Sequence, residues 1–142
     1  DQHAQPEAIA VGLDLTDRLT QSELRSEQLP WTKGKCFKGS AYVGRFVEWD
    51  NSLESLVDEQ NNLSLHLWVN DILVQSARLS EMTITPAAQR SELLTWAPVC
   101  AGDYLFTGTP SGVGQLHPKD RVYATLESHD GTVLSFIDTQ CD

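Results

Sequence analysis

The stretch of sequence that decides the fold is LSLHLWVNDILV, residues 63–74. Aliphatic residues occupy every second position from Leu63 to Val69, with Ser, His and Trp between them, which is the alternation of a half-buried strand. Asn70-Asp71 separates this run from the aliphatic residues 72–74, as the two-residue turn of a β-hairpin does. A hairpin at the centre of the chain predicts a domain built mainly from strands.

Three further strands are expected on the C-terminal side of the hairpin. Residues 103–107 and 121–127 are rich in β-branched and aromatic residues, which favour strands. Asp130-Gly131 predicts a turn from the second of these into a last strand, residues 132–137.

Short helices are expected at two places. Residues 20–23, Thr-Gln-Ser-Glu, match a capping box, so a helix is predicted from there to about Gln28, before Pro30. A second helix is predicted over residues 86–96, with Thr85 as its cap.

The segments before and after the first expected helix are predicted to be extended. Residues 8–13 form a nearly continuous apolar run that ends at Asp14, a pattern typical of a strand buried on both faces. Residues 31–47 have a strand-and-loop pattern, and residues 50–52 mark a turn. Without a repeat or a linker, residues 1–142 are predicted to form a single, mainly β domain with short helices, of the α+β class.

Composition narrows the functional classes. The chain has 142 residues, 40% of them hydrophobic, which suits one domain with a real core. Its formal net charge of −10 would repel a phosphate backbone, so nucleic-acid and anionic-membrane partners are not expected. No membrane span, no signal peptide and an odd number of scattered cysteines predict a soluble, cytoplasmic protein. Because the chain starts at Asp1 with a strand that needs neighbours, a preceding segment is expected to be missing.

Asp14 is the first candidate for chemistry. A carboxylate that ends an apolar strand needs a cation or hydrogen bonds to offset the cost of burial. The alternative is that it accepts backbone N–H bonds in the following turn, and spacing alone favours that alternative. Arg18 and Gln21 follow at four and seven residues and could lie near the same strand end. Taken alone, Arg18 is more typical of a surface ion pair.

Lys35 is the second candidate, because it lies between Gly34 and the pair Cys36-Phe37. A lysine held in this way can stabilise an enolate or a carboxylate. A solvated lysine at a strand edge is the alternative, and it is favoured by these residues alone.

The third candidate is the glycine-rich loop TGTPSGVG, residues 107–114, directly after an expected strand. Such loops can present backbone N–H groups and a hydroxyl to an anion, although a tight turn is the simpler interpretation. The loop is neither a P-loop nor a dinucleotide fingerprint, and Ser111 lacks the Gly-x-Ser-x-Gly pattern of a nucleophile elbow. The histidines show no metal spacing, and His66 is expected to be structural.

Taken in order, these pieces resemble the fumarylacetoacetate hydrolase family. The resemblance extends from about Ala8 to Val122. It is carried by GLDLTDR (residues 12–18), LPWT (29–32), KCF (35–37), AGD (101–103) and the loop at residues 107–114, with LWVN (67–70) and SEM (80–82) between them. The Leu-Pro-Trp element is more similar to the small single-domain members, the acylpyruvate hydrolases and oxaloacetate decarboxylases or tautomerases.

The resemblance implies a mixed β-roll, usually a homodimer, with a divalent-metal site. In it Asp14 is one of three carboxylate ligands to Mg²⁺ or Mn²⁺, and the other two are glutamates expected upstream of this segment. Lys35 stabilises the negative charge that develops on the substrate, and the backbone of the glycine-rich loop with Thr109 and Gly108 holds a substrate carboxylate. The acid–base group of the hydrolytic members is expected in a lid that also lies upstream.

Arg18 and Gln21 are implied to lie at the edge of this site. The chain departs from the family at Leu19, where Asp is usual, and at Lys38-Gly39, where some members have Thr. These departures bear on substrate preference more than on the metal.

The function implied is the hydrolysis, decarboxylation or tautomerisation of a 2,4-dioxo or related 2-oxo acid. The segment alone is expected to be inactive. The alternative is a catalytically inactive scaffold of the same fold that acts as a dimerising or binding module. An unrelated β domain with an anion-holding loop is the third interpretation.

Overall fold

The computed structural model describes residues 6–49 and 51–142. The chain divides into two compact units. The sheet unit comprises the described residues of 6–11 and 44–142, and the helical unit is Gly12–Val43. The expectation of one domain over residues 1–142 stays a prediction.

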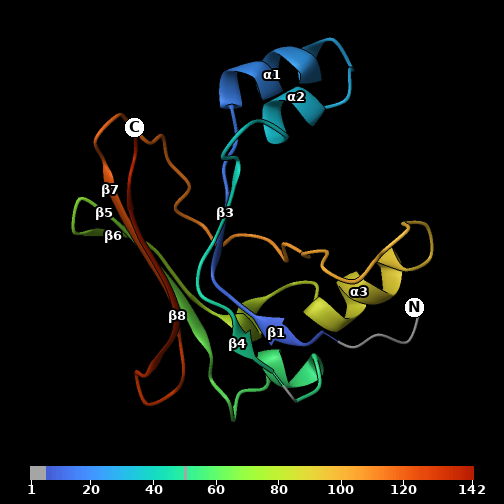
Figure 1. The fold of residues 1–142 in the computed structure, drawn as a ribbon, viewed down its shortest axis with the longest axis vertical. Coiled ribbons are helices and arrows are strands. Elements are labelled where there is room, and N and C mark those ends of the chain that lie inside the picture. The colour runs from blue at the N-terminus through green and yellow to red at the C-terminus, as the bar shows by residue number, and fades with distance from the viewer. Residues whose placement is uncertain (1–5, 50) are drawn as a thin grey trace. The chain divides into compact units, whose positions relative to one another are not determined.

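The centre of the sheet unit is a four-stranded antiparallel sheet in the order β6-β5-β7-β8 (Figure 1). Its strands are β5 (Ser64–Val69), β6 (Ile72–Arg78), β7 (Arg121–Glu127) and β8 (Val133–Gln140). The predicted hairpin is confirmed: β5 pairs with β6, and the turn residues Asn70 and Asp71 both have positive φ, 52° and 65°. Two successive positive φ values match the twist of the flanking strands, which is why Asn-Asp serves here. The last strand, β8, continues beyond its predicted end at Ile137.

One face of this sheet is the core. Cross-strand neighbours place Leu65 opposite Leu126 and Leu67 opposite Ala124, and Ala124 lies opposite Ile137 on β8. Leu126, Ala124 and Ile137 are at most 3% exposed, so the alternation in sequence does become an apolar face.

The apolar run at residues 8–13 is not one strand buried on both faces, as predicted. It forms β1 (Ala8–Ile9), which pairs with β4 (Val47–Glu48) in the sheet unit, and β2 (Gly12–Asp14), which pairs with β3 (Ala41–Val43) in the helical unit. Only Val11 between them is buried. The ladder breaks there because the Val11 amide donates to the side chain of Ser135 (3.1 Å) instead of to a strand.

The helical unit contains α1 (Arg18–Ser26) and α2 (Thr32–Lys35). The predicted capping box is wrong in position: the N-cap is Asp17, whose carboxylate accepts from the Thr20 amide (3.0 Å) and hydroxyl (2.7 Å). These two hydrogen bonds lower the pKa of Asp17 below its ordinary value. The helix ends two residues earlier than predicted, and α2 falls in a stretch that had been predicted as strand and loop.

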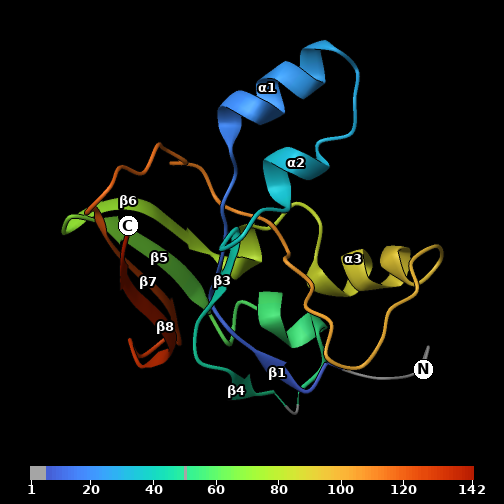
Figure 2. The same cartoon turned by 45° about the horizontal axis from the view of Figure 1, so that its top comes forward.

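The helix α3 (Pro86–Leu93) begins as predicted, with Thr85 as its cap, and ends three residues earlier than predicted. The strand predicted at residues 103–107 is wrong, because that segment forms no strand pairing and runs as the unarrowed orange trace between α3 and β7 in Figure 2.

Short 3₁₀ turns occupy Glu54–Val57 and Leu79–Glu81. The turn predicted at residues 50–52 includes Asp50, which lies outside the described residues. No helix among the described residues is both long and apolar enough to cross a membrane.

Candidate functional site

Asp14 and Lys35 lie together in the helical unit. The ammonium of Lys35 donates to Asp14 Oδ2 and to Thr16 Oγ1, both at 2.8 Å. The Lys35 side chain is 33% exposed and that of Asp14 is 51% exposed. Lys35 is thus held between two oxygens, and Asp14 is paired with a cation where backbone N–H bonds were the alternative.

Local backbone geometry produces this pair. Asp14 is the last residue of β2 and Lys35 the last residue of α2. The buried Gly34 lies against α1, since a Cβ there would come within 3.1 Å of the Gln21 backbone nitrogen and Cβ. The Asp17 amide also donates to the Gly34 carbonyl at 3.0 Å. Glycine before the lysine therefore lets α2 approach α1 closely enough to bring Lys35 to the end of β2.

Arg18 and Gln21 have different surroundings. Arg18 is exposed at the start of α1, and no ion pair to it is found within residues 6–49 and 51–142. Gln21 lies with its backbone and Cβ against Gly34. Leu19, where the family usually has Asp, is 72% exposed. The roles of Arg18 and Gln21 at the edge of a substrate site stay predictions.

The donor set fits a hard divalent cation only in part. A half-exposed carboxylate such as Asp14 is the oxygen ligand that Mg²⁺ and Mn²⁺ prefer. However, the part of the chain that the structure describes contains no group of three or more His, Cys, Asp or Glu side chains that could hold a metal. Asp14 would thus be one ligand of such an ion, with the remaining ligands supplied from outside the described residues.

Thr109 and Gly108 belong to the sheet unit, where the glycine-rich loop lies on β6. Gln75 Nε2 donates to Thr109 Oγ1 (3.0 Å), to the Pro110 carbonyl (2.7 Å) and, more weakly, to the Ser111 carbonyl (3.4 Å). Gln75 is only 9% exposed, whereas Thr109 is exposed. The loop is therefore attached to the sheet through one buried amide.

Glycine is required where the loop touches the strand. Gly112 has φ +101°, and a Cβ there would lie 1.9 Å from the Val74 carbonyl oxygen. Gly108 has φ +115° but open space around it. At the start of the loop, Gln89 Nε2 of α3 donates to the Thr107 carbonyl at 2.9 Å. Within the segment 103–107 that had been predicted as a strand, the Gln89 contact at Thr107 stands in place of strand pairing.

Gln75 and Gln89 are the functional candidates that the sequence had not revealed. Gln75 carries a usable signal, because it is a polar residue on the core face of a strand that begins Ile-Leu-Val. A buried amide needs partners, so its position predicts that some backbone lies across the strand. Gln89 carries no comparable signal.

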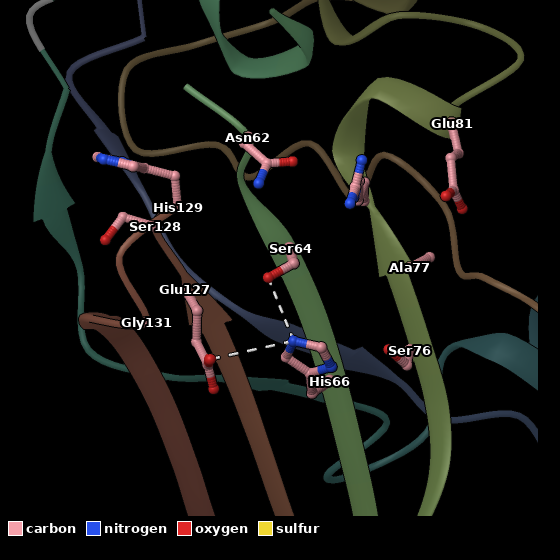
Figure 3. A pocket seen from close by; sticks show the side chains of 11 residues that line it. Asn62, Ser64, His66, Ser76, Ala77, Glu81, Glu127, Ser128, His129 and Gly131 are labelled. Atoms are coloured by element: carbon pink, nitrogen blue, oxygen red, sulfur yellow. Dashed lines mark hydrogen bonds and ion pairs between the residues drawn. The ribbon is translucent and has the colours of Figure 1, made fainter. Parts of the chain in front are cut away.

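A polar hollow of about 380 Å³ lies elsewhere in the sheet unit, at the Ser64 end of β5 (Figure 3). His66 Nε2 lies 3.2 Å from Ser64 Oγ and 4.0 Å from Glu127 Oε2. Both partners address the same ring nitrogen, whereas a catalytic triad uses the two nitrogens separately. The hollow contains none of the site residues predicted from the sequence.

Together, a mostly β chain, a carboxylate–lysine pair at a strand end and an amide-anchored glycine loop define a domain of the fumarylacetoacetate hydrolase class. The family profile described as "Fumarylacetoacetate (FAA) hydrolase C-terminal" matches residues 7–134, and the chain belongs to this family. The fold class predicted from the sequence is confirmed, since solved structures of the family have the same fold.

Known relatives give the comparison more detail. Oxaloacetate tautomerase FAHD1 from Bos taurus is 34% identical over 117 residues, which are 82% of this chain and 51% of the relative. Oxaloacetate tautomerase YcgM from Escherichia coli is 35% identical over 125 residues, 86% of this chain and 54% of the relative. The chain thus spans about half the length of these relatives.

Among solved structures, a yeast fumarylacetoacetate hydrolase family protein aligns with a TM-score of 0.84 at 27% identity. The alignment covers 96% of this chain and 56% of the yeast chain. A fumarylpyruvate hydrolase from Pseudomonas aeruginosa, in complex with Mn²⁺ and pyruvate, aligns with a TM-score of 0.76 at 28% identity. The alignment covers 95% of this chain and 55% of the hydrolase.

Proposed function

We propose that this chain forms part of an enzyme that acts on a small 2-oxo acid through its enol or enolate form, with Mg²⁺ or Mn²⁺ bound at Asp14. Keto–enol tautomerisation of oxaloacetate is the first reaction to test, because two of the relatives are oxaloacetate tautomerases. Hydrolysis of an acylpyruvate and decarboxylation are the related reactions for the same site.

The observation that carries the proposal is the pairing of Lys35 with Asp14. An ammonium has three hydrogens, and Lys35 directs two of them to Asp14 and Thr16. The third remains for a ligand oxygen, so the lysine is oriented and still able to donate. A fixed positive charge beside a developing enolate stabilises the transition state more than a mobile one, because its orientation is already determined.

A divalent metal at Asp14 is supported by the ligand chemistry of its carboxylate and by a similar solved structure that contains Mn²⁺. Asp14 would hold the ion through its carboxylate, and the bound ion would act as a Lewis acid on the keto oxygen of the substrate. The Pseudomonas fumarylpyruvate hydrolase structure contains Mn²⁺ and pyruvate, a metal and a 2-oxo acid of the required kinds.

The remaining assignments belong to the same proposal. The Thr109 hydroxyl and the loop backbone at Gly108 bind the substrate carboxylate, and Arg18 and Gln21 line the edge of the site. A homodimer and a cytoplasmic location are also proposed; the bovine relative is named as mitochondrial.

The test uses the protein made from its complete reading frame. Loss of the enol absorbance of oxaloacetate is followed with Mg²⁺ or Mn²⁺, with EDTA, and without protein to correct for the spontaneous reaction. We expect metal-dependent turnover that Asp14→Ala lowers by at least about a hundredfold, as removal of one electrostatic stabiliser typically does. Glu23→Gln, which neutralises an exposed carboxylate on α1, serves as the control and should retain activity.

Two outcomes would contradict the proposal. Equal turnover by wild type and Asp14→Ala would exclude the metal role of Asp14. Absence of metal-dependent turnover with oxaloacetate, and with an acylpyruvate followed in the same way, would favour the inactive scaffold. Pyruvate formation, measured in parallel, separates decarboxylation from tautomerisation.

A further inference from the structure

The orientation of the Gln75 amide is determined by its surroundings. Its Nε2 atom lies 2.7 Å from the Pro110 carbonyl oxygen, which can only accept a hydrogen bond. Exchanging the amide oxygen and nitrogen would place two acceptors against each other in a buried position, at a high cost in free energy. The nitrogen of Gln75 therefore faces the loop, and it donates to Thr109 Oγ1 as well.

This orientation determines what the Thr109 hydroxyl can do. A hydroxyl has one hydrogen to donate and two lone pairs to accept with. Because Gln75 occupies an accepting position of Thr109, the hydroxyl hydrogen is left for another partner. Within residues 6–49 and 51–142, no hydrogen bond donated by Thr109 is found, and the residue is exposed.

From this geometry we infer that Gln75 is a positioning residue that leaves the hydroxyl hydrogen of Thr109 for a ligand, so that the glycine-rich loop favours a ligand group that accepts, a carboxylate. The inference deepens the proposed function and rests on its assignment of Thr109 to the substrate carboxylate. A ligand group that presents only a hydrogen could use just the lone pair that Gln75 leaves, and the Thr109 hydrogen would then lack an acceptor in the ligand.

Gln89 supplies the matched comparison. It also holds the loop through a donated amide hydrogen, but its partner in the loop is the Thr107 carbonyl; it donates to the Ile84 carbonyl as well and makes no hydrogen bond to the Thr109 hydroxyl. Loss of Gln89 should loosen the loop without changing the polarity of Thr109, whereas loss of Gln75 should change both.

The test is a double-mutant cycle on the complete protein, with the Kd for pyruvate in the presence of Mn²⁺ measured by calorimetry and kcat and KM measured with oxaloacetate. Gln75→Met removes the donor and keeps the length of the side chain, and Thr109→Val removes the hydroxyl. We expect each to raise Kd and KM on the order of ten- to a hundredfold, with kcat less affected, since a hydrogen bond to a charged group is lost. The double variant should bind pyruvate more tightly than the sum of the two single effects predicts, because without the Thr109 hydroxyl only the loop-loosening part of the Gln75→Met effect remains.

Gln89→Met should raise Kd less, and its effect should add to that of Thr109→Val. Additive effects of Gln75→Met and Thr109→Val, or a Kd unchanged by Gln75→Met, would overturn the inference while leaving the role of Thr109 intact. A Kd unchanged by Thr109→Val would instead overturn the assignment of Thr109 in the proposed function, and the inference with it. Pyruvate binding with this pattern but without turnover would refute only the catalytic part of the proposed function.

Gln75→Glu provides a second readout if Gln75→Met does not fold. A neutral carboxylic acid at this position can donate one hydrogen to the Pro110 carbonyl, but an ionised one can only accept, and it would capture the Thr109 hydroxyl hydrogen. The Kd of this variant, divided by that of wild type at each pH, should therefore rise as the introduced carboxyl ionises. A ratio that does not change with pH would contradict the role of Gln75.

Discussion

Replacement of Gly112 by alanine tests whether the loop is built on β6 as described. Gly108 and Gly112 both have φ above +100°, where alanine or any other L-amino acid costs about 1–3 kcal/mol of backbone strain. Only at Gly112 does the new Cβ also meet a backbone oxygen, that of Val74, at 1.9 Å. A backbone oxygen cannot swing aside as a side chain can, so the loop must lift from the strand.

The size of the additional penalty follows from the hydrogen bonds that hold the loop on β6. Lifting the loop breaks the two shorter hydrogen bonds from Gln75, at 2.7 and 3.0 Å, each with a net contribution of about 0.5–1.5 kcal/mol. Gly112→Ala should therefore lower the free energy of unfolding by about 1–3 kcal/mol more than Gly108→Ala does.

Urea unfolding followed by tryptophan fluorescence gives both free energies, and NMR exchange of the Gln75 side-chain amide hydrogens, which donate to the loop, reports the local opening. Gly112→Ala should speed the exchange of these Gln75 hydrogens with solvent, and Gly108→Ala should leave their exchange as in wild type. Equal destabilisation by the two substitutions, with equal exchange, would show that the close approach to Val74 is not part of the native state.

Two other predictions concern stability. Ser135 is fully buried, and its hydroxyl accepts from the Val11 amide (3.1 Å) and donates to the Arg45 carbonyl (2.6 Å). Ser135→Ala should therefore lower the free energy of unfolding, measured by urea titration, by about 1–3 kcal/mol. In the same assay Ser76→Ala, at an exposed serine, should change it by less than about 0.5 kcal/mol. Because the folded pKa of Asp17 lies below the ordinary value of 3.8, its cap stabilises α1 fully above that pH and loses this effect as the pH falls through the lowered value. Helical circular dichroism of Asp17→Asn, which keeps a capping side chain without a titrating group, should lack this acid-dependent component. An identical acid profile in wild type and variant would contradict the assignment of the cap.

The elements that were predictable from the sequence are those whose information is local. The hairpin of β5 and β6 needs only alternation and a turn that accepts positive φ, and both are contained in twelve consecutive residues. The start of α3 similarly depends on Thr85 and the adjacent Pro86.

The strand predictions that were wrong concern segments whose structure depends on contacts with residues far away in the sequence. Residues 8–13 have the composition of one strand, but Ser135, 124 positions away, takes the Val11 amide and ends the ladder. Residues 103–107 also have strand composition, yet the contact available to Thr107 is the side chain of Gln89. At the N-cap of α1 the competition was local, since Asp17 and Thr20 are both good caps, and the carboxylate accepts both the amide and the hydroxyl of Thr20.

The candidate site shows the same division between local and distant information. From the residues alone, Asp14 was better explained as a turn acceptor and Lys35 as a solvated lysine, because the helix α2 that carries Lys35 has four residues and no side-chain cap. Their ion pair depends on Gly34 packing against α1, a contact between elements rather than a motif. The resemblance to the family pointed to both residues, because it depends on several motifs that occur in the same order along the chain. The buried Gln75 was available to a different kind of inference, since a polar side chain on an apolar face must have partners, and those partners are the loop that carries Thr109.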